Sequence, residues 1–493
     1  MTPLKILFLT AELAPFAKTG GLADVSAALP RHLTDHGHDA RVVLPLYGRI
    51  GVRHPELVLE PVPELQDIAF EHGPHRVVFS VKTTMIPGSD TPAYFVDCPP
   101  LFGRDAIYTQ DHDEHLRFLV LTRAALEMCQ RWAWAPDVFH LNDWHTAMLP
   151  LYLRTVYAWD ALFAGSRTLL TIHNLGHQGV FGSGVLPDLG LPDTHLLHQD
   201  DLREGRIGFL KTGLLLADRL STVSPTYARE IQTPGYGFGL DGVLRMRAGD
   251  LTGILNGVDY DVWDPRTDRY LVAKYSEKSL HRKEKNKEAL LDAMGLPYVK
   301  GVPVFGIVTR LTHQKGIDLL YEPVPRILGD HDARFIALGS GAEEYAQFLQ
   351  GLAARFPGKA RYFAGFDEKL AHLIEAGADF FLMPSRYEPC GLNQMYSLRY
   401  GTAPIVRATG GLVDTVQPFR ASTGEGNGFV FEHYTGDGLH WAMTHALEVH
   451  ADPKAWRTLQ KNAMAADFSW AVEGPRYVEL YRSMRPAKAG RAG

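Results

Sequence analysis

The sequence predicts an α/β protein with two doubly wound, Rossmann-like domains that face a deep cleft. Short apolar runs alternate with segments of helical spacing through most of the chain, which is typical of βαβ units with parallel sheets. At 493 residues the chain is too long for one ordinary core. A charged stretch without strand pattern separates two such series. The predicted parts are a first domain over 1–255, a linker with a surface helix over 256–300, a second domain over 301–469, a C-terminal helix over 470–484 and a disordered tail over 485–493.

In the first series, each strand is predicted from a short apolar or β-branched run that ends in polar residues. The predicted strands are Lys5–Thr10, Asp39–Leu46, Arg76–Met85, Ala93–Asp97, Val138–Leu141, Arg167–Ile172 and Arg219–Val223. Helical spacing covers Ala23–Asp35 and His112–Arg131.

The second series repeats the alternation. Its predicted strands are Val302–Val308, Ala333–Leu338, Arg361–Ala364, Asp379–Met383 and Ala403–Arg407. Its predicted helices are Gly316–Leu328, Glu343–Arg355, Glu368–Ala376 and one that continues from Tyr396 to Gly401. In the linker, Arg282, Lys283, Lys285 and Lys287 form a helical run that we interpret as a solvated face.

Composition and charge exclude several classes of function. Hydrophobic residues make up 45% and charged residues 22%, as in ordinary globular proteins, and the net charge of −6 favours neither nucleic acid nor a membrane surface as partner. The apolar run Lys5–Thr10 is too short for a membrane span or a signal peptide. Cys98, Cys129 and Cys390 lack metal or redox spacing, so we expect a cytoplasmic protein without disulfides. No pattern indicates an oligomeric state.

The segment Ser385–Tyr396 (SRYEPCGLNQMY) carries the strongest functional signal. It lies between a predicted buried strand and a helix, and it places Glu388, a proline and a glycine at that junction. Ligands bind outside the carboxyl ends of strands in open α/β sheets, and a helix N-terminus favours an anion there.

Two further strand–helix junctions carry cations and glycines. Lys18–Asp24 (KTGGLAD) contains a Gly-Gly turn whose amides could approach a phosphate, although such a pair alone is more often structural. In Thr309–Gly316 (TRLTHQKG), Arg310 and Lys315 offer a planar fork and a compact charge, as a diphosphate requires. From spacing alone, two solvated surface cations are an equal alternative.

Two neighbouring strands end in polar strings, Asp137–His145 (DVFHLNDWH) and Thr171–Gly179 (TIHNLGHQG). Their adjacency would bring Asp143 and His173 to one rim of a sheet. A metal site is an alternative, but the His-x4-His spacing is not a strong ligand pattern. Its ligands would come from His140, Asp143, His145, His173 and His177. Thr409-Gly410-Gly411 opens another helix. Its amides could contact a phosphate, or the segment could simply cap the helix.

These motifs, in their order along the chain over about Leu4 to Tyr481, resemble those of bacterial glycogen synthases and plant starch synthases. The chain departs from the usual family string at Gly176-His177, where Ala-Tyr is common, and we expect an altered acceptor surface with intact chemistry. Related retaining glycosyltransferases often carry a second glutamate eight residues after the first. Here that position is Tyr396, as in the glycogen synthase branch, so a two-glutamate mechanism does not transfer.

The resemblance implies a glycosyltransferase of the GT-B type that transfers glucose from ADP-glucose to the non-reducing end of an α-1,4-glucan such as glycogen, with retention of configuration. ADP-glucose would be a co-substrate, and no cofactor or metal is implied. The implied catalytic residues are Glu388, Asp143, His173, Arg310 and Lys315. The implied substrate-binding residues are Lys18, Gly20, Gly21, Asn256, Phe366, Cys390, Gly391, Leu392, Thr409, Gly410 and Gly411.

Within that resemblance, Phe366 would lie against the adenine, with an ordinary core phenylalanine as an equal alternative. Alternative functions are a transferase of the same fold that uses UDP-glucose or makes another α-glucan or glucoside, a catalytically dead glucan-binding protein, and a metal-dependent hydrolase.

Overall fold

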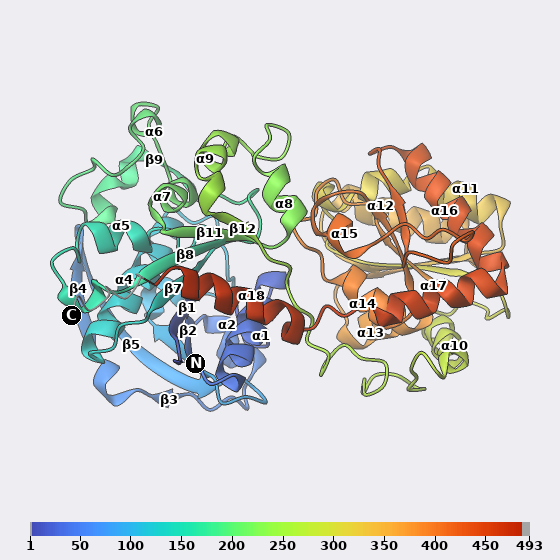
Figure 1. Ribbon diagram of the computed structural model, residues 1–493, viewed down its shortest axis with the longest axis horizontal. Coiled ribbons are helices and arrows are strands. Elements are labelled where there is room, and N and C mark those ends of the chain that lie inside the picture. The colour runs from blue at the N-terminus through green and yellow to red at the C-terminus, as the bar shows by residue number, and fades with distance from the viewer. Residues whose placement is uncertain (1, 486–493) are drawn as a thin grey trace, which may run out of the picture. The chain divides into compact units, whose positions relative to one another are not determined.

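The computed structural model describes residues 2–485, and the chain divides into two compact units (Figure 1). The first unit comprises the residues up to Val223, Ala228–Gly257 and the residues from Trp470 on, and the second comprises Ser224–Tyr227 and Val258–Ser469. The predicted tail lies, from residue 486 on, outside the described residues. Within 2–485, no helix combines the length and the apolar character that crossing a membrane requires.

The first unit is built on a ten-stranded sheet in the order β12-β11-β8-β7-β1-β2-β6-β5-β3, with β4 paired to β5. The path from β12 to β6 is parallel, whereas β3, β4 and β5 pair antiparallel. The strands are β1 (Lys5–Leu9), β2 (Asp39–Pro45), β3 (Glu60–Pro61), β4 (Ile68–His72), β5 (His75–Met85), β6 (Pro92–Asp97), β7 (Val138–Asn142), β8 (Arg167–Ile172), β11 (Arg219–Thr222) and β12 (Leu251–Gly253). A separate antiparallel pair joins β9 (Val180–Gly182) to β10 (Arg206–Gly208).

Helices cover this sheet, and one of them comes from the far end of the chain. The helices of this unit are α1 (Gly21–Asp35), α2 (Gly48–Arg53), α3 (Pro99–Phe102), α4 (Glu114–Arg131), α5 (Leu149–Arg154), α6 (Gln199–Arg203), α7 (Phe209–Leu216), α9 (Asp241–Met246) and α18 (Trp470–Ser483), whereas the residues of α8 (Pro225–Glu230) are divided between the two units. The red helix α18 lies beside the blue α1 in Figure 1, and its Trp470, Tyr477 and Tyr481 are buried in the first unit's core. Tyr481 also shares a hydrogen bond of 2.7 Å with His140 of β7.

The second unit has a six-stranded, fully parallel sheet in the order β15-β14-β13-β16-β17-β18. Its strands are β13 (Val304–Val308), β14 (Arg334–Gly339), β15 (Ala360–Ala364), β16 (Phe380–Met383), β17 (Ala403–Arg407) and β18 (Phe429–Phe431). This is the doubly wound order of dinucleotide-binding folds, and the strands β6 to β11 of the first unit follow the same pattern. The prediction of two α/β domains with mainly parallel sheets is confirmed.

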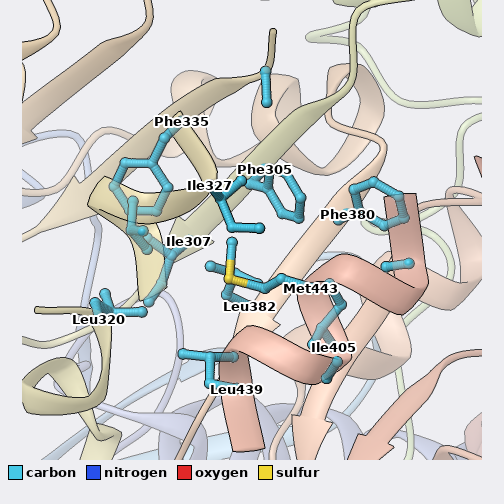
Figure 2. Packing of buried hydrophobic residues seen from close by; sticks show 14 of the residues in the cluster. Phe305, Ile307, Leu320, Ile327, Phe335, Phe380, Leu382, Ile405, Leu439 and Met443 are labelled. Carbon is cyan, nitrogen blue, oxygen red and sulfur yellow. The ribbon is translucent and has the colours of Figure 1, made fainter. Parts of the chain in front are cut away.

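The core of the second unit is a close-packed layer between its sheet and its helices. The helices are α10 (Lys283–Ala293), α11 (Pro323–Asp330), α12 (Glu343–Arg355), α13 (Glu368–Gly377), α14 (Asn393–Arg399), α15 (Gly410–Thr415), α16 (Gly436–Ala451) and α17 (Pro453–Ala465). Figure 2 shows side chains of β13, β14, β16 and β17 meeting Leu439 and Met443 of α16. Such packing fixes where each strand ends, and hence where the loops that follow begin.

Two local predictions were wrong. The helix expected over Gly316–Leu328 is a short 3₁₀ turn, Ile317–Leu320, followed by α11 from Pro323, because proline has no amide to continue the preceding turn. The basic run on α10 is not a solvated face throughout, because Lys283 and Lys287 are buried. The ammonium of Lys283 donates to two backbone carbonyls and Thr402, and that of Lys287 pairs with Asp379 at 2.8 Å.

Candidate active site

In each unit, predicted site residues follow the strands on either side of the point where the strand order reverses. That point lies between β1 and β7 in the first unit and between β13 and β16 in the second. Lys18 and Asp143 follow β1 and β7, whereas Lys315 and Glu388 follow β13 and β16. Open α/β sheets bind ligands at the carboxyl ends of the strands at such a point.

A buried carboxylate that the sequence did not single out organises the loop after β1. Glu12 accepts hydrogen bonds from the amide of Thr19 at 2.7 Å, from its hydroxyl at 2.5 Å, and from the amide of Gly20 at 3.1 Å. The Tyr108 hydroxyl donates to the same carboxylate at 2.6 Å. The Gly20 amide is therefore engaged inside the protein, and Glu12 holds the shape of the loop.

Lys18 and Gly20 leave this loop open on its outer side. The ammonium of Lys18 pairs with Asp24 at 2.6 Å, and both side chains keep substantial exposure. A Cβ on Gly20 would meet nothing within 4 Å, so there is room for a ligand close to the backbone. Gly21 is the first residue of α1, whose N-terminus favours an anion.

Asp143 joins the ends of β7 and β8. Its Oδ1 accepts from the amides of His173 at 2.7 Å and Asn174 at 3.3 Å, so the two predicted strings do meet at one rim. Asp143 has a φ of +55°, a left-handed conformation that is uncommon outside glycine. Burial raises the pKa of Asp143 to about 7, against the lowering effect of the two amides.

The ring of His173 is held from the side by a residue that the sequence analysis passed over. Its Nε2 lies 2.8 Å from Oδ1 of Asn142, the last residue of β7. Burial lowers the pKa of His173 to about 3, so the imidazole is neutral at physiological pH. The role of this amide depends on its contact with the Leu9 carbonyl of the neighbouring strand β1, which the sequence does not show.

The metal site considered as an alternative is not assembled. Both ring nitrogens of His140 are occupied, by Tyr481 and by Thr171. Over residues 2–485, no group of three or more His, Cys, Asp or Glu side chains is arranged to hold a metal ion.

Asn256 lies shortly after β12 and is buried, with 4% of its surface exposed. Its Oδ1 has no hydrogen-bond partner in the described part of the chain. An unpaired buried acceptor is costly, so this amide is a candidate for a contact with a ligand.

In the second unit, Lys315 and Glu388 form one cluster. The ammonium of Lys315 lies 2.6 Å from Oε2 of Glu388, and the Ser385 hydroxyl donates to the same oxygen at 2.9 Å. Arg310 is exposed just after β13. The ion pair is partly buried, and Arg310 is exposed at the end of β13, which neighbours β16.

Close backbone approach brings the two loops of this cluster together. Gly316, the residue after Lys315, has a φ of +69°, and a Cβ there would lie 2.0 Å from the carbonyl oxygen of Pro384. Only glycine fits such a contact, so the glycine places the Lys315 loop against the end of β16.

The motif Thr409-Gly410-Gly411 supports the Glu388 loop from behind. A Cβ on Gly410, whose φ is +48°, would lie 1.8 Å from the carbonyl oxygen of Glu388. The Gly411 amide donates to that oxygen at 3.1 Å and is therefore engaged within the protein. Thr409 is the N-cap residue of α15 and is buried.

The rest of the segment Ser385–Tyr396 leads into α14. Cys390 is buried, and Gly391 has a φ of +74°. The Gln394 side chain donates to the carbonyls of Cys390 and Gly391 at 3.0 and 3.1 Å, and Leu392 occupies the N-cap position. The turn is thus closed by its own helix.

Phe366 is 74% exposed, so the alternative that it is a core phenylalanine is wrong. It follows Gly365 at the carboxyl end of β15. An exposed aromatic ring at that edge is suited to stacking on a planar ligand.

Tyr396 is part of an aromatic stack. The Trp263 ring lies parallel to Tyr396 at 4.1 Å on one side and to His372 at 3.8 Å on the other. Tyr396, on α14 after the Glu388 loop, is therefore held against Trp263. The sequence analysis did not identify Trp263, because nothing in its local pattern indicates a partner 133 residues away.

Two family models match the chain, one in each half. Residues 5–246 match the family described as "Starch synthase catalytic domain", and residues 296–463 match "Glycosyl transferases group 1".

Curated relatives cover nearly the whole chain. The glycogen synthase of Koribacter versatilis is 44% identical over 99% of both chains, and that of an Anaeromyxobacter species is 46% identical over 98% of this chain and 99% of its own. Among solved structures, the catalytic domain of starch synthase IV from Arabidopsis thaliana, bound to ADP and acarbose, superposes with a TM-score of 0.90. That chain is 32% identical, and the match covers 98% of this chain and 99% of the other.

Proposed function

Because this chain belongs to the glycogen synthase family, we propose that it transfers glucose from ADP-glucose to the non-reducing end of an α-1,4-glucan, with retention of configuration. The observation that carries the proposal is the cluster of Lys315, Glu388 and Ser385 at the reversal point of the second sheet, where the exposed Arg310 also follows β13. The diphosphate of a nucleotide sugar needs cations at this edge, and its sugar needs a fixed carboxylate next to them.

Arg310 and Lys315 would bind the diphosphate and stabilise the charge that develops on the departing ADP. Lys18 and the N-terminus of α1 would add positive potential to the same group. The anomeric carbon becomes oxocarbenium-like as the glycosidic bond lengthens.

Glu388 would accept hydrogen bonds from hydroxyl groups of the glucose and so fix the orientation of the donor. Its ion pair with Lys315 supports binding rather than nucleophilic attack, because a carboxylate bonded to an ammonium is a weaker nucleophile. Asp143, His173 and Asn256 would complete the contacts to the sugar. Cys390, Gly391, Leu392, Thr409, Gly410 and Gly411 would shape the loop that carries Glu388.

Retention then follows from attack on the same face of the sugar. Retaining glycosidases use a carboxylate nucleophile, whereas the site residues proposed here include no carboxylate for that task. The acceptor hydroxyl would approach on the side of the leaving phosphate, which could take its proton. Tyr396, in place of a second glutamate, agrees with this route.

The adenine would stack on the exposed ring of Phe366. The similarity to a starch synthase whose structure holds ADP supports ADP-glucose over UDP-glucose. We also propose that the reaction runs in the cytoplasm, since Cys98, Cys129 and Cys390 are buried and form no disulfide, as is usual in a reducing compartment. We propose no cofactor, because the proposed transfer needs only the nucleotide sugar and the acceptor.

The test is nucleotide release by the purified protein, given glycogen with ADP-glucose or with UDP-glucose. We expect fast ADP release that depends on glycogen. Preferential UDP release would move the protein to another branch of the same fold. No release with either donor would favour a glucan-binding protein, and activity lost to a chelator would favour a metal-dependent enzyme.

A further inference from the structure

We propose that Asn142 is a positioning residue that holds His173 as the neutral tautomer protonated on Nε2, so that Nδ1 is left to accept a hydrogen bond from a substrate hydroxyl. The inference rests on the proposed function only for the nature of the substrate, a sugar. The tautomer itself follows from contacts within the first unit.

The first step is the orientation of the Asn142 side chain. Its Nδ2 donates to the carbonyl oxygen of Leu9 at 2.9 Å. A carbonyl oxygen can only accept, so the amide nitrogen must face Leu9 and Oδ1 must face the other way. Asn142 is fully buried, and its backbone amide donates to Thr146 at 2.7 Å, which leaves the side chain little freedom.

The second step passes this orientation to the histidine. Oδ1 of Asn142, also an acceptor only, lies 2.8 Å from Nε2 of His173. Nε2 must therefore carry the proton. Burial lowers the pKa of His173 to about 3, so the ring has a single proton and Nδ1 keeps its lone pair.

The charged and titratable neighbours do not oppose this state. Asp143 contacts the backbone amide of His173. His140, on β7, is bonded to Thr171 and Tyr481, and burial keeps its pKa well below the usual value. Glu12 is turned toward Thr19, Gly20 and Tyr108. None of these groups makes a hydrogen bond to the His173 ring among the described contacts.

The third step concerns Nδ1, which has no hydrogen-bond partner among residues 2–485, while the His173 side chain is partly exposed. An acceptor that is neutral, fixed in direction and free is suited to a hydroxyl that must donate. A charged imidazolium, or the other tautomer, would present a proton there and repel the same hydroxyl proton. Asn142 thus determines that His173 accepts, rather than donates, the hydrogen bond to the substrate, although Asn142 does not itself contact the substrate.

The test uses the full-length protein labelled with ¹⁵N in its histidines. NMR chemical shifts distinguish a protonated from an unprotonated ring nitrogen, and the His173 signals are assigned by their loss in a His173→Gln variant. We expect a protonated Nε2 and an unprotonated Nδ1 between pH 6 and 8. A protonated Nδ1 in the wild-type protein would overturn the proposal without any variant.

Asn142→Ala should give averaged signals from two tautomers and lower kcat/KM about 10- to 100-fold, the range found when the hydrogen-bond partner of a metal-bound histidine is removed. The control is Asn462→Ala in α17, which also removes two side-chain hydrogen bonds, in this case both to backbone carbonyls, but should leave the His173 signals and kcat/KM unchanged. An unchanged tautomer or an unchanged kcat/KM in Asn142→Ala would overturn the role of Asn142. A wild-type protein inactive with every donor would refute the proposed function instead, while the NMR result would still decide the tautomer.

Discussion

The ammonium of Lys315 lies 2.6 Å from the carboxylate of Glu388, a residue 73 positions further along the chain and only 4% exposed. Each side chain is therefore the other's partner before any substrate arrives. A change at either position alters both the ligand contacts and the electrostatics of the remaining group.

Replacing either Lys315 or Glu388 should remove most turnover, and the effects of the two replacements should not add. We expect Glu388→Gln and Lys315→Met each to lower kcat about 100-fold or more, because each removes a charge aimed at the reacting donor. The double variant should be little worse than the poorer single variant, since the residues act as a unit. ADP release at saturating substrates measures this. Lys285→Met, at an exposed position on α10, is the control, and near-normal turnover of Glu388→Gln would remove Glu388 from the mechanism.

Gly410→Ala should damage the Glu388 loop. The new Cβ would lie 1.8 Å from the Glu388 carbonyl oxygen at a φ of +48°, so the loop must move. We expect a loss of activity together with a lower Tm. Gly351→Ala is the matched control, because this glycine lies in α12 with nothing within 4 Å, and alanine there should stabilise the helix by about 0.5–1 kcal/mol. Equal behaviour of the two variants would refute the supporting role of Gly410.

Glu12→Gln should raise the KM for the nucleotide sugar. The substitution turns one acceptor oxygen into a donor that faces the Thr19 and Gly20 amides or the Tyr108 hydroxyl, so the loop after β1 loses its shape. A tenfold rise in KM would correspond to about 1.4 kcal/mol of binding energy, and we expect an effect of this order. Glu71→Gln, an exposed position on β4, should leave KM unchanged. A wild-type KM for Glu12→Gln would show that the loop keeps its shape without this carboxylate.

Glu375→Gln should change how stability depends on pH. Burial raises the pKa of Glu375 from 4.5 to about 8, against the lowering effects of Ser397 and Lys283. A raised folded-state pKa contributes stability below about pH 4.5 that is lost as the pH rises through 8. The glutamine variant lacks this loss, so its advantage over the wild type should grow from pH 5 to pH 8.

Thermal unfolding of both proteins across that range measures the difference. Burial lowers the pKa of nearby Lys283 to about 7, which makes stability rise with pH between about 7 and 10.5, so the comparison is cleanest below pH 7. A constant difference between the two proteins from pH 5 to pH 7 would contradict the buried, protonated state of Glu375.

The sequence predicted the position of those candidate site residues that stand at the carboxyl ends of strands. Arg310 and Lys315 after β13, and Asp143 after β7, could be placed because apolar runs reveal where buried strands end. Asn142 and Trp263 could not, since each acts on a residue brought near only by the folded sheet or by packing. Glu12 could not either, since only the folded loop turns its carboxylate toward Thr19 and Gly20. Their sequence neighbours look like ordinary strand or loop.

The sequence also did not predict which charged residues are buried. The run that includes Lys283 and Lys287 has the composition of a solvated helix, and only tertiary contacts with Asp379 and backbone carbonyls make burial tolerable. Likewise, helical spacing over Gly316–Leu328 does not reveal that Pro323 starts a new helix. Hydrophobic periodicity in a sequence indicates which face of a helix is apolar, but not whether a polar group has a hydrogen-bond or ion-pair partner when it is buried.

The return of α18 to the first unit sets an order for synthesis on the ribosome. When residue 257 has been added, the first unit still lacks Trp470, Tyr477 and Tyr481, which its core includes. The second unit, complete from Val258 to Ser469 apart from the four residues made earlier, can close its core first. The amino-terminal half of this protein is therefore the last to finish folding, and a nascent chain stalled before residue 470 leaves that half with an uncovered apolar face.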